Sequence, residues 1–320
     1  MRKIVLGRTN EEVSAISLGT WAFGGESMSG KISVGWGGQT ESDSKRALLA
    51  AWENGINHWD TADVYGDGKS ESIIGEMWND IPRKDVFLAT KVGWDKGPFS
   101  NYYEPKHMVR NLERSLKNLK TDCADLVYLH HCNFGKNGEY FDEALDVLTN
   151  FKSQGRLRFI GLSDWSNSRI MKYIKMCDPD VIQPYRNVMD DGFIKSGLCS
   201  YVNKNNLGVC FFSPIKHGLL TGKYDKPTSF EIGDHRSGVK GFADQKVIDK
   251  MKQNKLLLEK RFAKHKYPVM RGLVDALFND AKSGCVLLGQ RNVDQVNVAS
   301  TLGEPMDEKD SVWVKSLYQH

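Results

Sequence analysis

Four residues from three separate stretches of the chain carry side chains that together could move a proton. Asp60 and Tyr65 lie in the segment 59–66, while Lys91 and His130 stand at the ends of two later apolar runs. A phenol beside an ammonium, a carboxylate and an imidazole can transfer one proton near neutral pH. Because the ends of parallel strands converge at one mouth of a barrel, residues this far apart in sequence could meet in a single site.

Each of the four side chains has its own expected role. Tyr65 begins as a weak acid, with an ordinary pKa of about 10, and the Lys91 ammonium is expected to lower that pKa. Asp60 would hold Lys91 in an ion pair, and His130 would donate a ring N–H to the oxygen of a bound carbonyl. No Ser, Cys or Asp is placed as a nucleophile, so a hydride from a cofactor is the expected reactant. Taken singly, each residue could instead be structural, as a strand-end cap, a loop residue, an ion pair or a core histidine.

Short apolar runs that recur along the chain indicate the strands that position these residues. The runs are continuous rather than alternating, which is typical of parallel strands buried on both faces. Amphipathic helices are expected between them, for example over 104–119 and 141–151. This α/β pattern predicts a (β/α)8 TIM barrel in a single domain over residues 1–320, with an open doubly wound sheet as the alternative. The expected strands are Ile16–Leu18, Asn57–Asp60, Val86–Thr90, Leu126–Leu129, Phe159–Leu162, Val181–Gln183, Val209–Phe212 and Val286–Leu288.

Three segments are additional to the alternating strands and helices of a simple barrel. Residues 1–15 are expected to form an N-terminal hairpin that closes the bottom of the barrel. Residues 25–40, rich in Gly and Ser, and the polar residues 224–243 are expected to form long loops on the catalytic face, where such loops usually wall a ligand. The last expected helix, Glu308–Tyr318, is predicted to dock near the mouth.

The composition excludes several classes of protein. Hydrophobic residues make up 40% and charged residues 26% of the 320 residues, and the net charge is only +4. There is no stripe of Lys and Arg, so we expect no nucleic-acid partner. The apolar runs are too short for a signal peptide or a membrane span. Six scattered cysteines without CxxC spacing suggest buried, reduced thiols, so we expect a cytoplasmic protein; nothing in the sequence indicates an oligomeric state.

Two motifs invite other interpretations that we disfavour. His130, His131 and Cys132 suggest a metal site, but successive strand residues point to opposite faces, so we expect no metal there. The run 66–70 resembles the end of a phosphate-binding P-loop, but the first glycine of that motif would fall on Asp63. A turn before a helix is the better interpretation. His58, inside an expected strand, is expected to be a core residue or a support to the site.

The chain resembles the aldo-keto reductases over nearly its whole length. The motifs are Gly19-Thr20-Trp21, Asp60-Thr61-Ala62 with Tyr65-Gly66 and Ser70-Glu71, Thr90-Lys91, Asp125-Leu126 with His130, Gly161-Leu162-Ser163, Gln183 and Ser213-Pro214. The first loop, ending Trp36-Gly37-Gly38, and the run Gly218–Tyr224 resemble a bacterial branch of that family. The resemblance implies that Asp60, Tyr65, Lys91 and His130 are the catalytic tetrad.

The resemblance also implies the cofactor NADP(H), with NAD as the alternative, bound without a Rossmann fold. Ser163 and Gln183 would bind the nicotinamide carboxamide, and Phe212 would stack on the ring in place of the usual tyrosine. Arg291 would bind the 2′-phosphate. The complete set of cofactor residues implied in this way is Gly19, Thr20, Trp21, Ser163, Asp164, Gln183, Phe212, Ser213, Pro214, Ile215, Gly218, Leu219, Arg236, Gly289, Arg291 and Gln295.

Three departures from the family pattern predict weaker cofactor binding than is typical. Asp164 stands where Asn is usual and cannot donate as an amide does. Arg186 replaces a common tyrosine, and Val298-Ala299 replaces a Glu-Asn pair that holds the adenine. The expected substrate walls are Trp21, Trp36 and Trp94, whose rings suit apolar carbonyl compounds and also stack on sugar rings.

Taken together, the residues and the resemblance predict an NADP(H)-dependent oxidoreductase of aldehydes or ketones, sugar-like ones included, or of the corresponding alcohols. Tyr65 would be its proton donor or acceptor. One alternative is a regulatory subunit that binds the cofactor with little turnover. Another is a lyase or aldolase in which Lys91 forms a Schiff base, which is disfavoured because Asp60 would keep Lys91 protonated.

Overall fold

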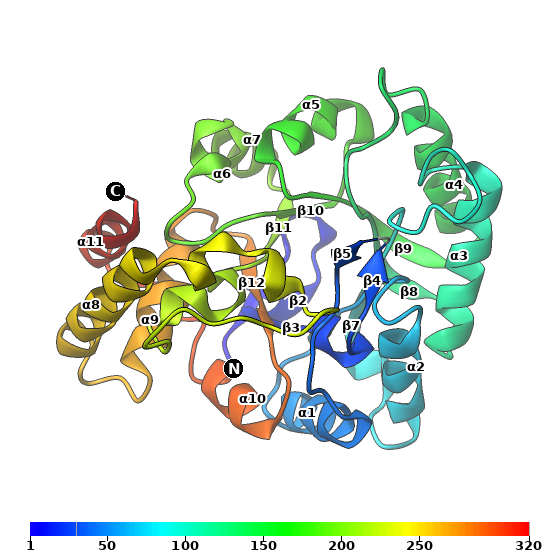
Figure 1. Ribbon diagram of the computed structural model, residues 1–320. Helices are drawn as coiled ribbons and strands as arrows, with labels where there is room; N and C mark the ends of the chain where they lie inside the picture. The colour runs from blue at the N-terminus through cyan, green and yellow to red at the C-terminus, as the bar shows by residue number, and fades with distance from the viewer. Residues whose placement is uncertain (30, 320) are drawn as a thin grey trace.

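A closed barrel of eight parallel strands forms the centre of the computed structural model, which describes residues 1–29 and 31–319 (Figure 1). Around the barrel the strands follow the order β10-β11-β12-β3-β6-β7-β8-β9, so β12 pairs with β3 and closes the sheet. The predicted (β/α)8 barrel is confirmed. The strands are β3 (Ile16–Gly19), β6 (His58–Asp60), β7 (Phe87–Val92), β8 (Ala124–Leu129), β9 (Leu157–Asp164), β10 (Val181–Pro184), β11 (Gly208–Phe211) and β12 (Gly284–Gly289).

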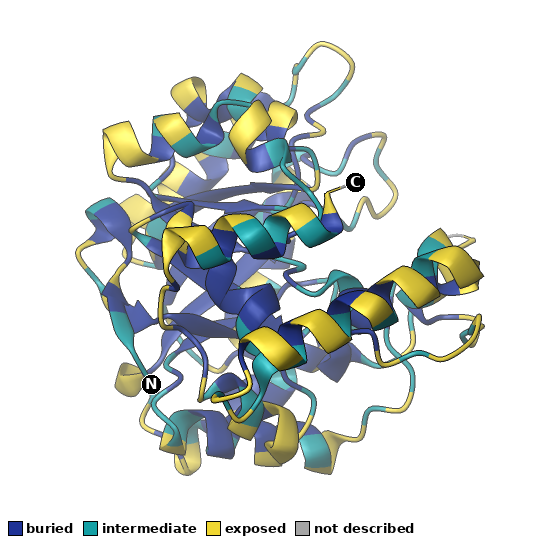
Figure 2. Cartoon of the chain, turned by 90° about the vertical axis from the view of Figure 1, so that its left-hand side faces the viewer, coloured by how far each residue is buried: buried dark blue, intermediate teal, exposed yellow. Residues whose placement is uncertain are grey.

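Helices surround the barrel and bury one face each against it (Figure 2). In α3, for example, Pro105 begins the helix, and Met108 and Leu112 one turn apart face inward. Among the helices that the structure describes, none is both long and apolar enough to cross a membrane. The α-helices are α1 (Glu41–Glu53), α2 (Lys69–Gly75), α3 (Pro105–Asn118), α4 (Phe141–Ser153), α5 (Asn167–Cys177), α6 (Gly192–Lys195), α7 (Leu198–Asn205), α8 (Gln245–Arg261), α9 (Pro268–Asp275), α10 (Val293–Ala299) and α11 (Glu308–Tyr318).

The N-terminal segment forms the predicted hairpin, with β1 (Lys3–Val5) antiparallel to β2 (Glu12–Ser14). It covers the end of the barrel where the strands begin, because the Arg8 amide donates to the carbonyl of Asn206, just before β11. At the tip, Gly7 has a φ of 53°, and a Cβ there would lie 2.2 Å from the Gly208 nitrogen. Only glycine fits this close approach.

The two long segments at the opposite end of the barrel are joined to each other. Residues 25–40 are not a plain loop as predicted, since they contain a short antiparallel pair, β4 (Met28–Ser29) and β5 (Ile32–Ser33). Residues 224–243 contain two 3₁₀ turns. The His235 amide donates to Gly35 at 2.9 Å, and the Asp234 carboxylate accepts from the Gly37 amide at 3.1 Å. These bonds hold the two segments together across the mouth.

The C-terminal helix α11 has the predicted bounds and meets the mouth at its C-terminal end. It packs against α8, α9 and the 3₁₀ turn Ala276–Asn279, on the outside of the barrel. It approaches the mouth only at its end, where the Tyr318 hydroxyl donates to the Leu220 carbonyl at 3.2 Å.

Candidate active site

The four residues predicted to act together lie together at the carboxyl ends of neighbouring strands. Asp60 ends β6, Lys91 lies near the end of β7, His130 directly follows β8, and Tyr65 lies on the loop after β6. The Lys91 Nζ atom donates to Asp60 Oδ1 at 2.5 Å, to the Thr61 carbonyl at 2.7 Å and to the Tyr65 hydroxyl oxygen at 3.2 Å. An ammonium has three donors, and all three are used here. The Tyr65 proton is therefore left free for another acceptor.

The ion pair beneath Tyr65 is deeply buried. The side chains of Lys91 and Asp60 are only 2% and 1% exposed. Burial alone would lower the pKa of Lys91, but Asp60 and Tyr65 raise it above its ordinary value, so the ammonium stays charged. The second oxygen of Asp60 accepts a hydrogen bond from Gln183 Nε2 at 2.8 Å, so both carboxylate oxygens have partners.

The pKa of Tyr65 is raised above its ordinary value, although Lys91 lowers it as predicted. Removal of the phenol from water raises the pKa, and the opposing effect of Lys91 is smaller. The sequence shows the charge beside the hydroxyl but not the loss of solvent around it, which has the larger effect. At neutral pH Tyr65 is protonated, and it can act as an acid.

His130 stands across from Tyr65 as a neutral imidazole. The ring centroids are 6.0 Å apart and the rings are nearly perpendicular, at 78°. Enclosure by the protein lowers the pKa of His130 well below its ordinary value, and the positive charge of Lys91 lowers it further. A neutral ring carries one N–H donor, which suffices to bind a carbonyl oxygen.

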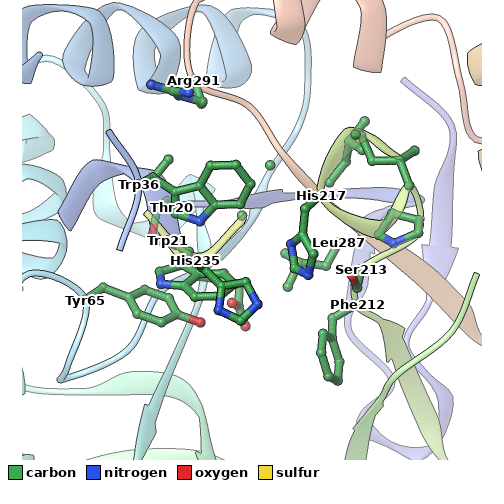
Figure 3. Close-up of a pocket in the computed structure, with 18 of the residues that line it drawn as sticks. Thr20, Trp21, Trp36, Tyr65, Phe212, Ser213, His217, His235, Leu287 and Arg291 are labelled. Carbon is green, nitrogen blue, oxygen red and sulfur yellow. Dashed lines mark hydrogen bonds between the residues drawn. The ribbon is translucent and has the colours of Figure 1, made fainter. Parts of the chain in front are cut away.

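A cavity of about 640 Å³ opens above the tetrad. Figure 3 shows Tyr65 and Phe212 toward one end of it and Arg291 at the other. Trp21, Trp36 and Trp94, predicted to form substrate walls, all line it. All the predicted cofactor residues except two also line it, namely Gly19, Thr20, Trp21, Ser163, Gln183, Phe212, Ser213, Pro214, Ile215, Gly218, Arg236, Gly289, Arg291 and Gln295.

Asp164 and Leu219 are the two predicted cofactor residues that lie outside the cavity lining. The Asp164 carboxylate accepts from the backbone amides of Cys132 and Ser166, at 2.7 Å and 2.6 Å. These bonds fix the loop after β8 and the start of α5, and a carboxylate accepts two such bonds better than an amide would. Leu219 is only 2% exposed and lies within the 3₁₀ segment Lys216–Thr221.

The lining suits a long ligand with an aromatic end and an anionic end. The Ser213 hydroxyl is buried without a partner among the described residues, and a Cβ on Gly289 would meet no atom within 4 Å. Arg291 donates only to neutral oxygens, those of Gln39 and Gly37. Burial and the nearby Arg236 lower the pKa of Arg291. A positive charge without a carboxylate partner in the described part of the chain favours an anionic ligand such as a phosphate.

Several lining residues have no counterpart in the sequence-based predictions, chief among them Trp165, His217 and His235. The ring of His235 lies 4.9 Å from that of Trp21 and 4.8 Å from that of His217 (Figure 3). Burial lowers the pKa of His217 to about 3, so it is neutral at physiological pH. His235 lies in the predicted loop 224–243, and His217 lies between the predicted cofactor residues Ile215 and Gly218, but no spacing distinguished either histidine from its neighbours.

Comparison with known proteins places this geometry in a family. A sequence profile of the aldo/keto reductase family matches residues 15–309. The chain is 32% identical over 232 residues to the aldo-keto reductase YhdN of Bacillus subtilis, covering 72% of this chain and 66%, slightly less than two thirds, of YhdN. It is 30% identical over 269 residues to an NADH-specific methylglyoxal reductase of Escherichia coli, covering 79% of each chain. A glycerol dehydrogenase from Gluconobacter oxydans has a similar structure, with a TM-score of 0.81, 27% identity and coverage of 98% of this chain and 94% of that one.

The resemblance inferred from the motifs is thereby confirmed. The profile spans nearly the whole barrel, and the structural similarity extends over almost the full length of both chains. This chain belongs to the aldo/keto reductase family of oxidoreductases.

Proposed function

We propose that this chain is an NADP(H)-dependent oxidoreductase that interconverts aldehydes or ketones, sugar-like ones included, with the corresponding alcohols. The observation that carries this proposal is the contact of the Tyr65 hydroxyl with a buried, charged Lys91 at 3.2 Å, on the wall of a cavity of about 640 Å³ that Arg291 also lines. The names of the relatives, a methylglyoxal reductase and a glycerol dehydrogenase, agree with small carbonyl compounds and polyols.

The tetrad explains how a carbonyl could be protonated. The substrate oxygen would bind between the Tyr65 hydroxyl and the neutral His130 ring, where two donors stabilise negative charge that develops on it. A cofactor held by residues such as Gln183, Ser213 and Arg291 would supply the hydride to the carbonyl carbon. The Tyr65 proton would then move to the substrate oxygen, and the Lys91 ammonium would stabilise the phenolate that remains. In alcohol oxidation the proton would move the opposite way.

The test is a pair of measurements on the wild-type protein. Fluorescence titration would give the affinities for NADPH and NADH, and NADPH consumption would be followed with methylglyoxal, glyceraldehyde and an aromatic aldehyde. We expect binding and turnover. Tight binding without turnover on any carbonyl would contradict the proposal and leave a cofactor-binding regulatory protein. A borohydride-trapped adduct on Lys91 would instead identify a Schiff-base lyase.

Arg291→Ala should raise the KM for NADPH about 10- to 100-fold, because one or two charge-assisted hydrogen bonds to a phosphate are lost. The KM for NADH should change much less, since NADH lacks the 2′-phosphate. Arg8→Ala is a suitable control, because Arg8 pairs with Asp178 outside the cavity. Equal losses for both cofactors would show that Arg291 does not bind the 2′-phosphate.

The pH dependence of the two directions should differ. The pKa of Tyr65 lies above its ordinary value, so Tyr65 stays protonated through neutral pH and carbonyl reduction should stay level. Reduction should decline only as the pH rises toward that pKa, whereas alcohol oxidation, which needs the phenolate, should increase over the same range. His130 should add no transition near about pH 6.5, because its pKa is well below that value. A transition near about pH 6.5 in the pH dependence of kcat would show that His130 changes its protonation state near neutral pH.

A further inference from the structure

A cluster of three soft donor groups lies in the interior of the barrel, and the proposed reaction does not use it. His58 begins β6, Cys210 lies in β11 and Cys285 lies in β12. All three are completely buried, and one donor atom from each lies within 4.8 Å of the other two. None of the three lines the active-site cavity. The cluster is therefore a separate feature of the molecule.

The backbone of the barrel holds these donors in place. Cys210 and Cys285 are direct partners in the pairing of β11 with β12, so their side chains share a face of the sheet. His58 precedes Asp60 by two residues, so both side chains lie on the same face of β6. The donors come from strands far apart in the chain, so no spacing in the sequence predicts that they form a cluster.

The polar atoms of the cluster face one another. His58 Nδ1 contacts the Cys285 Sγ atom at 3.4 Å, and the Cys285 thiol also lies 3.5 Å from the Val209 carbonyl oxygen. Two thiols and an imidazole together form a donor set typical of metal sites.

The spacing of the donors fits a bound ion. Metal–sulfur bonds of about 2.3 Å and metal–nitrogen bonds of about 2.0 Å place neighbouring donors about 3.6 Å apart in tetrahedral geometry. The observed separation of 3.4 Å between Nδ1 and the Cys285 sulfur is close to this value. All three donor atoms lie within 4.8 Å of one another, so the wider separations would have to shorten toward about 3.6 Å to coordinate an ion.

We propose that His58, Cys210 and Cys285 bind one soft d¹⁰ metal ion, Zn²⁺ or Cu⁺, inside the barrel. Thiolate and imidazole ligands select such ions, whereas Mg²⁺ and Ca²⁺ require oxygen ligands. Binding releases the two thiol protons, and the two thiolates then balance the charge of Zn²⁺. The ion would be structural, because it would tie β6 to β11 and β12 without contacting the substrate.

Complete burial determines how the ion would exchange. It would enter while the chain folds, so a chelator should not remove it from the native protein but should remove it after unfolding. This behaviour differs from that of an adventitious surface ion, which a chelator removes at once.

The test measures metal content and does not depend on the proposed reductase activity. Protein from zinc- or copper-supplemented cells, treated with a chelator in the native state, would be analysed by mass spectrometry for bound metal. We expect about one ion per chain for the wild type and for Cys177→Ser, a buried cysteine on α5 outside the cluster. Cys285→Ser and His58→Phe should lose most of the bound metal. Which supplemented metal is retained distinguishes Zn²⁺ from Cu⁺.

A second measurement uses only the wild-type protein, so it does not depend on whether the variants fold. Wild-type protein refolded with Co²⁺ should show a thiolate-to-cobalt charge-transfer band that persists after native chelator treatment. Wild-type protein with neither retained metal nor this band would overturn the proposal. An intact mass lower by two hydrogen atoms, with Cys210 and Cys285 joined by a disulfide and no metal bound, would overturn it too.

Discussion

Tyr65→Phe should lower kcat for carbonyl reduction by about 10²- to 10⁴-fold, the usual range for loss of a general acid. The substitution removes only the hydroxyl that contacts Lys91 Nζ at 3.2 Å, and it leaves the ring in place. Trp21, which stacks on Tyr65 with ring centroids 6.0 Å apart, keeps its neighbour. We therefore expect NADPH affinity to be unchanged, so the defect would lie in the chemical step rather than in binding.

A matched control separates this effect from the loss of any tyrosine. Tyr201→Phe removes a hydroxyl on α7, outside the cavity, and should leave kcat unchanged. Steady-state NADPH consumption and fluorescence titration on the three proteins give kcat and cofactor affinity separately. If Tyr65→Phe turns over as fast as wild type, the proton comes from another group and the proposed mechanism is wrong.

The barrel and the clustering of the tetrad could be predicted because they depend on local patterns. A parallel strand buried on both faces is a short, mostly apolar run, and polar residues such as Asp60 and Lys91 lie at or near its carboxyl end. Once the runs are counted, barrel closure brings the strand ends together. The resemblance to a family then assigned the roles that spacing alone could not.

Other features depend on the balance of opposing effects or on side-chain direction. The pKa of Tyr65 depends on the loss of water as well as on the Lys91 charge, and the sequence shows only the charge. Asp164 follows Ser163 in the chain, yet its carboxylate bonds to the Cys132 amide instead of facing the cavity. His217 and His235 reach the cavity through loops whose paths no periodic pattern specifies.

Lys91→Met should abolish measurable turnover and also destabilise the fold by about 3–5 kcal/mol. The reason for the second effect is that Asp60, 1% exposed and 2.5 Å from Lys91 Nζ, would keep a buried charge without its partner. Gln183 would still donate to Asp60, but a neutral amide does not compensate a full charge. Urea denaturation measures the stability, and NADPH consumption measures the activity.

The double variant Asp60→Asn/Lys91→Met separates the two roles of the pair. Removing both charges removes the buried imbalance, so much of the stability lost in Lys91→Met should return. The activity should not return, because no ammonium would then stabilise the Tyr65 phenolate. Lys45→Met is the surface control: Lys45 pairs with Glu41 and Glu76 on exposed helix faces, where solvent screens the charges, so its loss should leave the stability nearly unchanged.

These outcomes make the two functions of one ion pair distinguishable. A stable Lys91→Met would show that Asp60 takes up a proton when its partner is lost, so that the pair is not needed to neutralise the interior. An active double variant would show that the charge on Lys91 is dispensable for proton transfer. Only recovered stability together with absent activity fits a lysine whose charge serves both the buried Asp60 and the tyrosyl oxygen 3.2 Å from its amine.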